Sequence, residues 1–199
     1  MYHPSRLAQA ENEGGVCGRT RSADGFKTAQ DVTDERKTMH FSLIDKIDVL
    51  EPHKRIVATK SLSLAEEYLQ DHFPKFPVMP GVLMIEAMTE TAAWLVRHGE
   101  DFAHSMVLLK EVKNVKFGQF LQPGQTLTLT ATLVSEDDDT AVFKADGSIE
   151  GQSRVRAQLV LTKYNLCDRN PAKKTVDRDV IESMRKRFNI LWRGTEIGG

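Results

Sequence analysis

Hydrophobic and polar residues alternate through the second half of the chain with the period of two that is typical of β-strands. Residues 126–133 alternate strictly, with four threonines on one side and apolar residues on the other. Residues 154–162 repeat this alternation, and residues 106–117 and 140–149 have the composition of strands. The residues expected to face the core are Leu127, Leu129, Ala131, Leu133, Val155, Ala157, Leu159 and Leu161. The second half therefore predicts long antiparallel strands.

Residues 82–97 form the most hydrophobic segment of the chain, and they are apolar on most sides of a helix. Such a helix belongs inside a fold rather than on its surface. Its single polar stripe is expected to hold Glu86, Thr89, Glu90 and Arg97. A buried helix followed by antiparallel strands predicts an α+β fold, in which the sheet is wrapped around the helix.

Three shorter elements are expected before this helix. Residues 41–50 and 55–61 have the composition of strands. Ser63 is followed by Glu66 three residues later, which is the pattern of a helix capping box. We therefore expect a short helix over residues 63–69.

The two ends of the chain differ from this patterned region. Residues 1–38 are polar and lack periodicity, so we expect them to be disordered, and we place the folded domain at residues 39–165. Residues 166–199 form a C-terminal extension, in which residues 176–192 predict an amphipathic helix. Its apolar stripe is Val180, Ile181, Met184, Phe188 and Leu191, with Arg185, Lys186 and Arg187 expected to face away. This helix is expected either to pack on its own domain or dimer, or to dock on an acidic partner or an anionic lipid surface.

Composition excludes several classes of function. The net charge of the 199-residue chain is −1, which predicts neither nucleic acid nor an acidic membrane surface as a partner. No apolar run is long enough for a membrane span, and the N-terminus lacks the features of a secretory signal. The two cysteines, Cys17 and Cys167, form neither a metal-binding spacing nor a disulfide framework. We therefore expect a cytoplasmic protein without a membrane span.

Three prolines at positions 74, 77 and 80 precede the apolar helix. Each proline fixes its own φ and holds the preceding residue extended, so this stretch predicts a stiff strut. The strut would present His72 at one end and lead into the helix at Gly81.

This stretch combines the parts that an acid/base enzyme needs. His72 is a candidate general base, because the pKa of histidine lies near neutrality. Burial of Glu86 in the helix would raise its pKa and make it a proton donor. The free N–H groups at Gly81 and Val82 could stabilise an oxyanion. The set suits abstraction of a proton next to a carbonyl followed by loss of a leaving group, without a metal or another cofactor. From spacing alone, a structural His72 and a Glu86 paired with an arginine remain open.

One long motif strongly resembles the signature of the 3-hydroxyacyl-acyl carrier protein dehydratases of the FabZ type: His72-Phe73-Pro74-x-x-Pro77-x-x-Pro80-Gly81-Val82-Leu83-x-x-Glu86-Ala87-Met88. The likeness covers about residues 40–163. It implies a hot-dog fold and dimers that pair their sheets edge to edge, often three dimers to a hexamer. It also implies an active site at the dimer interface, with His72 from one subunit and Glu86 from the other.

The implied reaction converts a (3R)-3-hydroxyacyl thioester, carried by acyl carrier protein or coenzyme A, to the trans-2-enoyl thioester in fatty acid biosynthesis. His72 would take the α-proton, Glu86 would help the hydroxyl leave, and the N–H of Gly81 would bind the thioester carbonyl. From their position, Phe73, Val78 and Met79 are expected to line the acyl tunnel.

The sequence departs from the family at three places. Asp71 stands where the family usually has Gly, Glu90 stands where it usually has Gln, and the usual basic residues after Phe117 are absent. Two carboxylates one helical turn apart, Glu86 and Glu90, are expected to raise one pKa. The candidates to replace the missing basic pair are Lys113, Lys116 or the Arg185–Arg187 cluster. Two alternatives stay open: a hot-dog thioesterase in which Asp71 or Glu90 activates water, and a non-catalytic acyl-binding subunit.

Overall fold

A computed structural model describes residues 42–71 and 75–196; residues 1–41, 72–74 and 197–199, and with them the segment expected to be disordered, lie outside this description. The helices and strands follow in the order β1 Lys46–Glu51, β2 Arg55–Ser61, α1 Tyr68–Asp71, α2 Gly81–Gly99, β3 Met106–Phe117, β4 Thr126–Glu136, β5 Thr140–Ile149, β6 Gln152–Tyr164, α3 Lys174–Leu191 and β7 Trp192–Glu196. Two short 3₁₀ turns, Leu166–Asp168 and Pro171–Lys173, connect β6 to α3.

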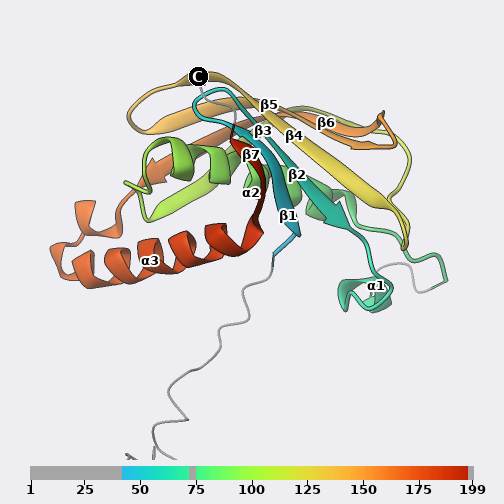
Figure 1. Ribbon diagram of the computed structural model, residues 1–199, viewed down its shortest axis with the longest axis horizontal. Coiled ribbons are helices and arrows are strands. Elements are labelled where there is room, and N and C mark those ends of the chain that lie inside the picture. The colour runs from blue at the N-terminus through green and yellow to red at the C-terminus, as the bar shows by residue number, and fades with distance from the viewer. Residues whose placement is uncertain (1–41, 72–74, 197–199) are drawn as a thin grey trace, which may run out of the picture. The chain divides into compact units, whose positions relative to one another are not determined.

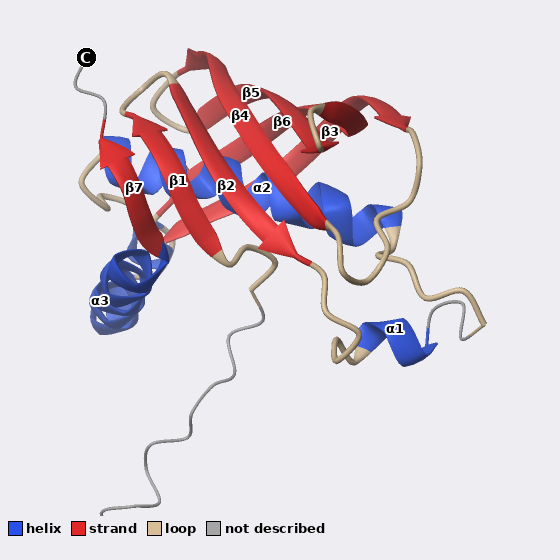
Figure 2. Cartoon of the chain, turned by 45° about the vertical axis from the view of Figure 1, so that its right-hand side comes forward, coloured by secondary structure: helices blue, strands red, loops and turns tan. Residues whose placement is uncertain are grey.

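The strands form one curved sheet in the order β3-β6-β5-β4-β2-β1-β7, and this sheet wraps around α2 (Figures 1 and 2). All neighbouring strands are antiparallel except β1 and β7, which are parallel. Leu127, Leu129 and Ala131 are fully buried, as their alternation predicts, because one face of β4 covers the core. The predicted α+β fold, a sheet around a central helix, is confirmed.

α2 supplies the centre of the hydrophobic core. Ten of its residues are buried, and most of these lie in its second half. Trp94 is among the largest fully buried side chains of the described residues, and it contacts Phe188 of α3 at 6.1 Å between ring centroids. The first turns of α2 are less covered, and Val82 is 70% exposed. The helix is therefore buried unevenly, and its N-terminal end is the open one. Among the described residues, no helix is both long and apolar enough to cross a membrane.

The C-terminal extension adds α3 and β7 to the domain. α3 confirms the predicted amphipathic helix, and its Phe188 packs among aromatic rings of α2 and the loop that follows. β7 extends the sheet beside β1, which the sequence did not predict. At Gly194 a Cβ atom would lie 1.7 Å from the backbone oxygen of Asp48, so only glycine allows the two strands to approach.

Two predicted elements begin later than expected. The first strand starts at Lys46, because Leu43 donates its backbone N–H to a carboxylate on α2 instead of to a strand.

The capping-box prediction is wrong, and α1 begins only at Tyr68. Ser63 does accept a hydrogen bond from the N–H of Ala65, at 3.2 Å. The partner in the box, Glu66, instead binds the buried Lys60 at 2.6 Å.

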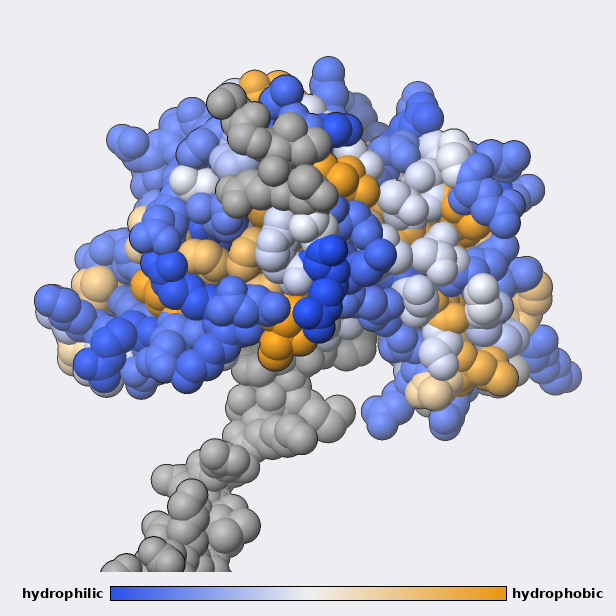
Figure 3. Space-filling view, viewed as in Figure 1, coloured by the Kyte–Doolittle hydropathy of each residue, from blue (hydrophilic) through white to orange (hydrophobic). Residues whose placement is uncertain are grey.

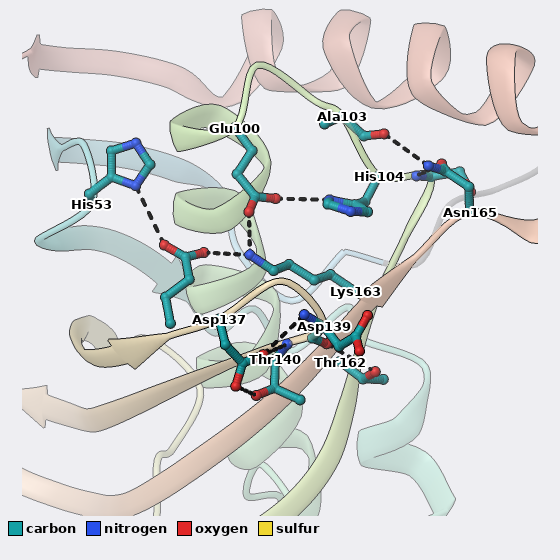
Figure 4. Close-up of polar contacts among 12 residues, drawn as sticks. His53, Glu100, Ala103, His104, Asp137, Asp139, Thr140, Thr162, Lys163 and Asn165 are labelled. Atoms are coloured by element: carbon teal, nitrogen blue, oxygen red, sulfur yellow. Dashed lines mark hydrogen bonds and ion pairs between the residues drawn. The ribbon is translucent and has the colours of Figure 1, made fainter. Parts of the chain in front are cut away.

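A charged cluster closes the end of the sheet near the C-terminus of α2 (Figure 4). The Lys163 ammonium group is almost completely buried, and it donates to Glu100 and, at 3.0 Å, to Glu136. His104 contacts Glu100 at 2.9 Å, and His53 contacts Glu136 at 3.5 Å. Burial alone would lower the pKa of Lys163, but the hydrogen bonds to the two carboxylates outweigh it and raise the pKa. This cluster joins α2, β4 and β6 at one point.

We expect Lys163→Met to lower the free energy of unfolding by about 2 kcal/mol at pH 7, since it removes the buried cation that pairs with two partly buried carboxylates. Urea unfolding followed by circular dichroism measures this loss. Lys144→Met removes an exposed lysine of β5 as the matched control, and it should change stability by less than about 0.5 kcal/mol. Equal effects of the two substitutions would contradict the structural role of the cluster.

Candidate active site

The entry to α2 is held in an extended conformation at Pro80. Pro80 is the N-cap residue with φ −57° and ψ 139°, which is the left-handed extended conformation expected of the strut. The N–H of Met79 donates to Leu121 at 2.9 Å and fixes the strut against the loop before β4. Among the described residues, no side chain caps the helix, so the amides of Gly81 and Val82 begin it uncapped.

An aromatic ring lies over this helix start. A Cβ atom on Gly81 would lie 2.9 Å from Cε1 of Phe117, so the ring contacts the glycine backbone directly. Phe117 ends β3 and is 55% exposed on its other side. Glycine therefore lets an apolar ring approach the positive end of the helix closely.

Glu86 lies on the second turn of α2, and its side chain is exposed rather than buried as predicted. The neighbouring atoms still remove part of the solvent around its carboxyl group. This desolvation, and in second place the negative charge of Glu90, raises the pKa of Glu86. The predicted direction of the shift is thus confirmed, although the chain alone does not bury the group.

Glu90 lies one helical turn after Glu86, and its carboxylate is hydrogen-bonded to other residues of the chain. Its Oε1 accepts a hydrogen bond from Ser42 Oγ at 2.8 Å, and its Oε2 accepts one from the N–H of Leu43 at 2.8 Å. The guanidinium of Arg187 lies 3.8 Å from Oε1, and both side chains are 18% exposed. These contacts anchor the start of the domain and a helix of the C-terminal extension to the same side chain.

The structure brings together some of the predicted site residues and leaves others undescribed. Gly81, Val82 and Glu86 lie within the first two turns of α2, and Val82 and Glu86 share one exposed side. Val78 and Met79 are completely buried, and Met79 belongs to the hydrophobic core cluster. His72 and Phe73 lie outside the described residues.

Exposed hydrophobic residues surround this end of α2. Phe76 and Phe120 meet edge to face, with 6.4 Å between ring centroids, and each is about half exposed. Val82 and Phe117 extend the apolar surface across the helix start. The space-filling view shows hydrophobic residues gathered at the surface near α1, on the same end of the domain (Figure 3). Surface of this kind is typical of protein interfaces and binding sites.

The basic residues of α3 do not all face solvent, which corrects the prediction for Arg187. Arg185 donates to the carboxylate of Asp101 at 2.8 Å, and Arg187 points back to Glu90.

Lys113 on β3 pairs with Glu111 at 2.9 Å. Lys116 is exposed and lines a groove of about 570 Å³ on the outer face of the sheet. Of the candidate replacements for the missing basic pair, Lys116 is therefore exposed and, among the described residues, forms no ion pair.

Two contributors to this site were not identified from the sequence. Ser42 precedes the first strand, and Arg187 stands beside the apolar stripe of α3, where the helical pattern places it towards solvent. Only the tertiary packing of α3 on α2 reveals their shared contact with Glu90. Within the described residues, no group of three or more His, Cys, Asp or Glu is arranged to hold a metal ion.

Comparisons with known proteins identify relatives of this chain. The family model of the FabA-like domain matches residues 36–158. The 3-hydroxyacyl-[acyl-carrier-protein] dehydratase FabZ of Clostridium novyi is 32% identical over 136 residues, which cover 68% of this chain and 94% of that protein. FabZ of Lactiplantibacillus plantarum is 40% identical over 116 residues, which cover 58% of this chain and 79% of that protein.

A similarity to solved structures supports the same architecture. The dehydratase heterocomplex ApeI:P from Xenorhabdus doucetiae contains a chain that aligns with a TM-score of 0.55 at 17% identity, covering 66% of this chain and 89% of that one. At this identity the similarity concerns the fold alone. Together with the wrapped sheet, it identifies the hot-dog fold.

The raised pKa of Glu86 predicts a pH-dependent effect of Glu86→Gln on thermal stability. Because the folded-state pKa exceeds the unfolded value, ionisation of Glu86 costs stability only as the pH rises through the folded pKa. We expect equal melting temperatures of variant and wild type near pH 4, and a variant that is more stable by about 1–2 °C at pH 8.

Glu182→Gln on α3 is the control of opposite sign for this experiment. A hydrogen bond from Lys186 lowers the pKa of Glu182, so this substitution should lower the melting temperature at pH 8 and lose its effect towards pH 3. Differential scanning calorimetry at the three pH values measures both variants. A Glu86→Gln variant that is less stable than wild type at pH 8 would contradict the raised pKa.

Proposed function

Since the chain belongs to the FabA-like domain family, we propose that it is a FabZ-type dehydratase, which removes water from (3R)-3-hydroxyacyl thioesters in fatty acid biosynthesis. The product would be the trans-2-enoyl thioester. One observation carries this proposal: an exposed carboxyl with a raised pKa, Glu86, lies beside the uncapped start of α2 at Gly81. A cytoplasmic location stays a prediction.

In the proposed reaction, His72 removes the α-proton of the thioester while the carbonyl oxygen accepts hydrogen bonds at the start of α2. The N–H of Gly81 and the positive end of the helix dipole stabilise the negative charge that develops there. Protonated Glu86 gives its proton to the β-hydroxyl, the carbon–oxygen bond breaks, and water leaves as the double bond forms. Transfer of the proton from His72 to Glu86, directly or through solvent, restores both groups.

We further propose that the working unit is a homodimer, or a trimer of such dimers, with His72 of one subunit facing Glu86 of its partner. The apolar surface around Val82 and Phe117 supports this, because a partner that covers it would also bury Glu86 more deeply. The free edge strand β3 lies beside the same surface and is available for pairing of sheets. Val78, Met79 and Phe73 would line the acyl tunnel at that interface.

The acyl group would reach the site on acyl carrier protein or on coenzyme A. An acidic carrier needs a basic surface nearby, and Lys116 of β3 is exposed close to Phe117. The Arg185 and Arg187 side chains are already paired with Asp101 and Glu90, which makes them weaker candidates for docking.

The thioesterase alternative is less well supported by the contacts of Glu90. A carboxylate that accepts two hydrogen bonds and faces an arginine is poorly placed to activate water. The side chain of Asp71 lies outside the described residues.

Incubation with a 3-hydroxyacyl-acyl carrier protein tests the proposal directly. We expect enoyl product, detected by mass spectrometry, without release of free thiol. His72→Ala and Glu86→Gln should each lower kcat by about 100-fold or more, because each removes a proton-transfer group. Asp179→Asn, on the exposed side of α3, is the control and should retain full activity.

The other outcomes of this assay identify the alternatives. Free thiol without enoyl product would indicate a thioesterase, and retained ligand without either product would indicate an acyl-binding subunit. Full activity of either His72→Ala or Glu86→Gln would exclude the proposed mechanism.

A further inference from the structure

Glu90 connects the proposed acid to a part of the chain outside the family domain. It stands one helical turn from Glu86 on the same side of α2, which makes the two carboxylates close neighbours. Its oxygens accept hydrogen bonds from Ser42 and Leu43, which precede β1. Arg187 of α3 forms an ion pair with the same carboxylate. The FabA-like match ends at residue 158, so Arg187 reaches this site from the C-terminal extension.

The packing of α3 holds Arg187 in place. Its neighbour Phe188 is buried, with ring centroids 5.0 Å from His98 and 5.9 Å from Phe102. Arg185, two residues before Arg187, binds Asp101 and lies over the ring of Phe102. α3 is thereby fixed along the C-terminal half of α2, as Figure 1 shows. The guanidinium of Arg187 therefore lies near Glu90, in the middle of α2.

We propose that Arg187 is a positioning residue of the active site, which holds and neutralises Glu90 and so controls the negative charge beside Glu86. This inference rests on the proposed function, in which Glu86 is the acid. The distance of 3.8 Å is longer than a hydrogen bond, so Arg187 acts on Glu90 mainly through its charge. The hydrogen bonds from Ser42 and Leu43 keep the carboxylate oriented.

The charged groups around Glu90 are few in the part of the chain that the structure describes. Glu86 lies on its own helix, Arg187 approaches from α3, and Arg97 lies further along α2. Burial lowers the pKa of Arg97 to about 10, Glu90 opposes this shift and Arg187 adds to it, so Arg97 is still charged at neutral pH. The negative charge of Glu90 therefore favours the protonated form of Glu86. The positive charges of Arg187 and Arg97 reduce this effect of Glu90.

Arg187 and Glu90 should therefore shift the titration of Glu86 in opposite directions. Glu90→Gln removes the like charge, and the midpoint of Glu86 should fall by about 0.5 pH unit. Arg187→Gln leaves Glu90 unbalanced, and the midpoint should rise by about 0.5 pH unit. In the double variant the two shifts should largely cancel, because the opposite charges of residues 90 and 187 act additively on the titration of Glu86.

The measurement is an NMR titration of the side-chain carboxyl carbon of Glu86 in the full-length protein, assigned with Glu86→Gln. Arg187→Lys keeps the charge and should retain the wild-type midpoint. Lys186→Gln, which removes an exposed cation next to Arg187 in the sequence, should not move it. Melting temperatures recorded in parallel separate loss of fold from loss of charge.

Opposite shifts that follow the charge of residues 90 and 187 would support the inference. A lowered melting temperature with an unchanged Glu86 midpoint would overturn it, since the contact would then be only structural. Turnover measured on the same variants keeps the two proposals distinct. Shifted midpoints in a protein without dehydratase activity would reject the proposed function and leave the electrostatic coupling established.

Discussion

The curved sheet buries α2, and the positions of the candidate site residues follow from this burial. The sheet needs a central hydrophobic helix, and Trp94, Met88 and their neighbours provide it. Yet the helix is covered unevenly. α3 packs along the C-terminal half of α2, whereas Val82 and Glu86 are exposed on one side of its first two turns. The fold thereby places the start of a buried helix, with its unpaired amides, at the surface where chemistry can use it.

The electrostatics of the site follow from the same uneven coverage. Glu86 lies at the boundary between the open and the covered parts of α2, where it is partly desolvated but still accessible. Glu90 lies just inside that boundary, where Ser42, Leu43 and Arg187 surround its carboxylate. Two carboxylates one turn apart consequently have different surroundings, and of the two only Glu86 is exposed. Differences of this kind between neighbouring acids are how one site separates a proton donor from a structural charge.

Much of the fold could be predicted from the sequence, because the strands alternate strictly and the central helix has a long apolar run. The strand β7 could not, since five residues with one glycine carry no periodicity, and its position depends on the approach of Gly194 to Asp48. The capping box at Ser63 was misleading, because tertiary contact with Lys60 competes for Glu66. The proline strut, Gly81 and Glu86 could be identified from one motif. The contact of Arg187 with Glu90 could not, since it depends on how two helices distant in sequence pack.

Mixing two inactive variants shows whether each active site takes His72 from one subunit and Glu86 from the other, as we propose. His72→Ala and Glu86→Gln dimers are combined, allowed to exchange subunits, and assayed for enoyl product. A mixed dimer then contains one site with both groups intact, so activity should return to about a quarter of the wild-type value at equal amounts. If subunit exchange is demonstrated and the mixture stays as inactive as its components, the two residues do not meet across an interface, and the account is contradicted.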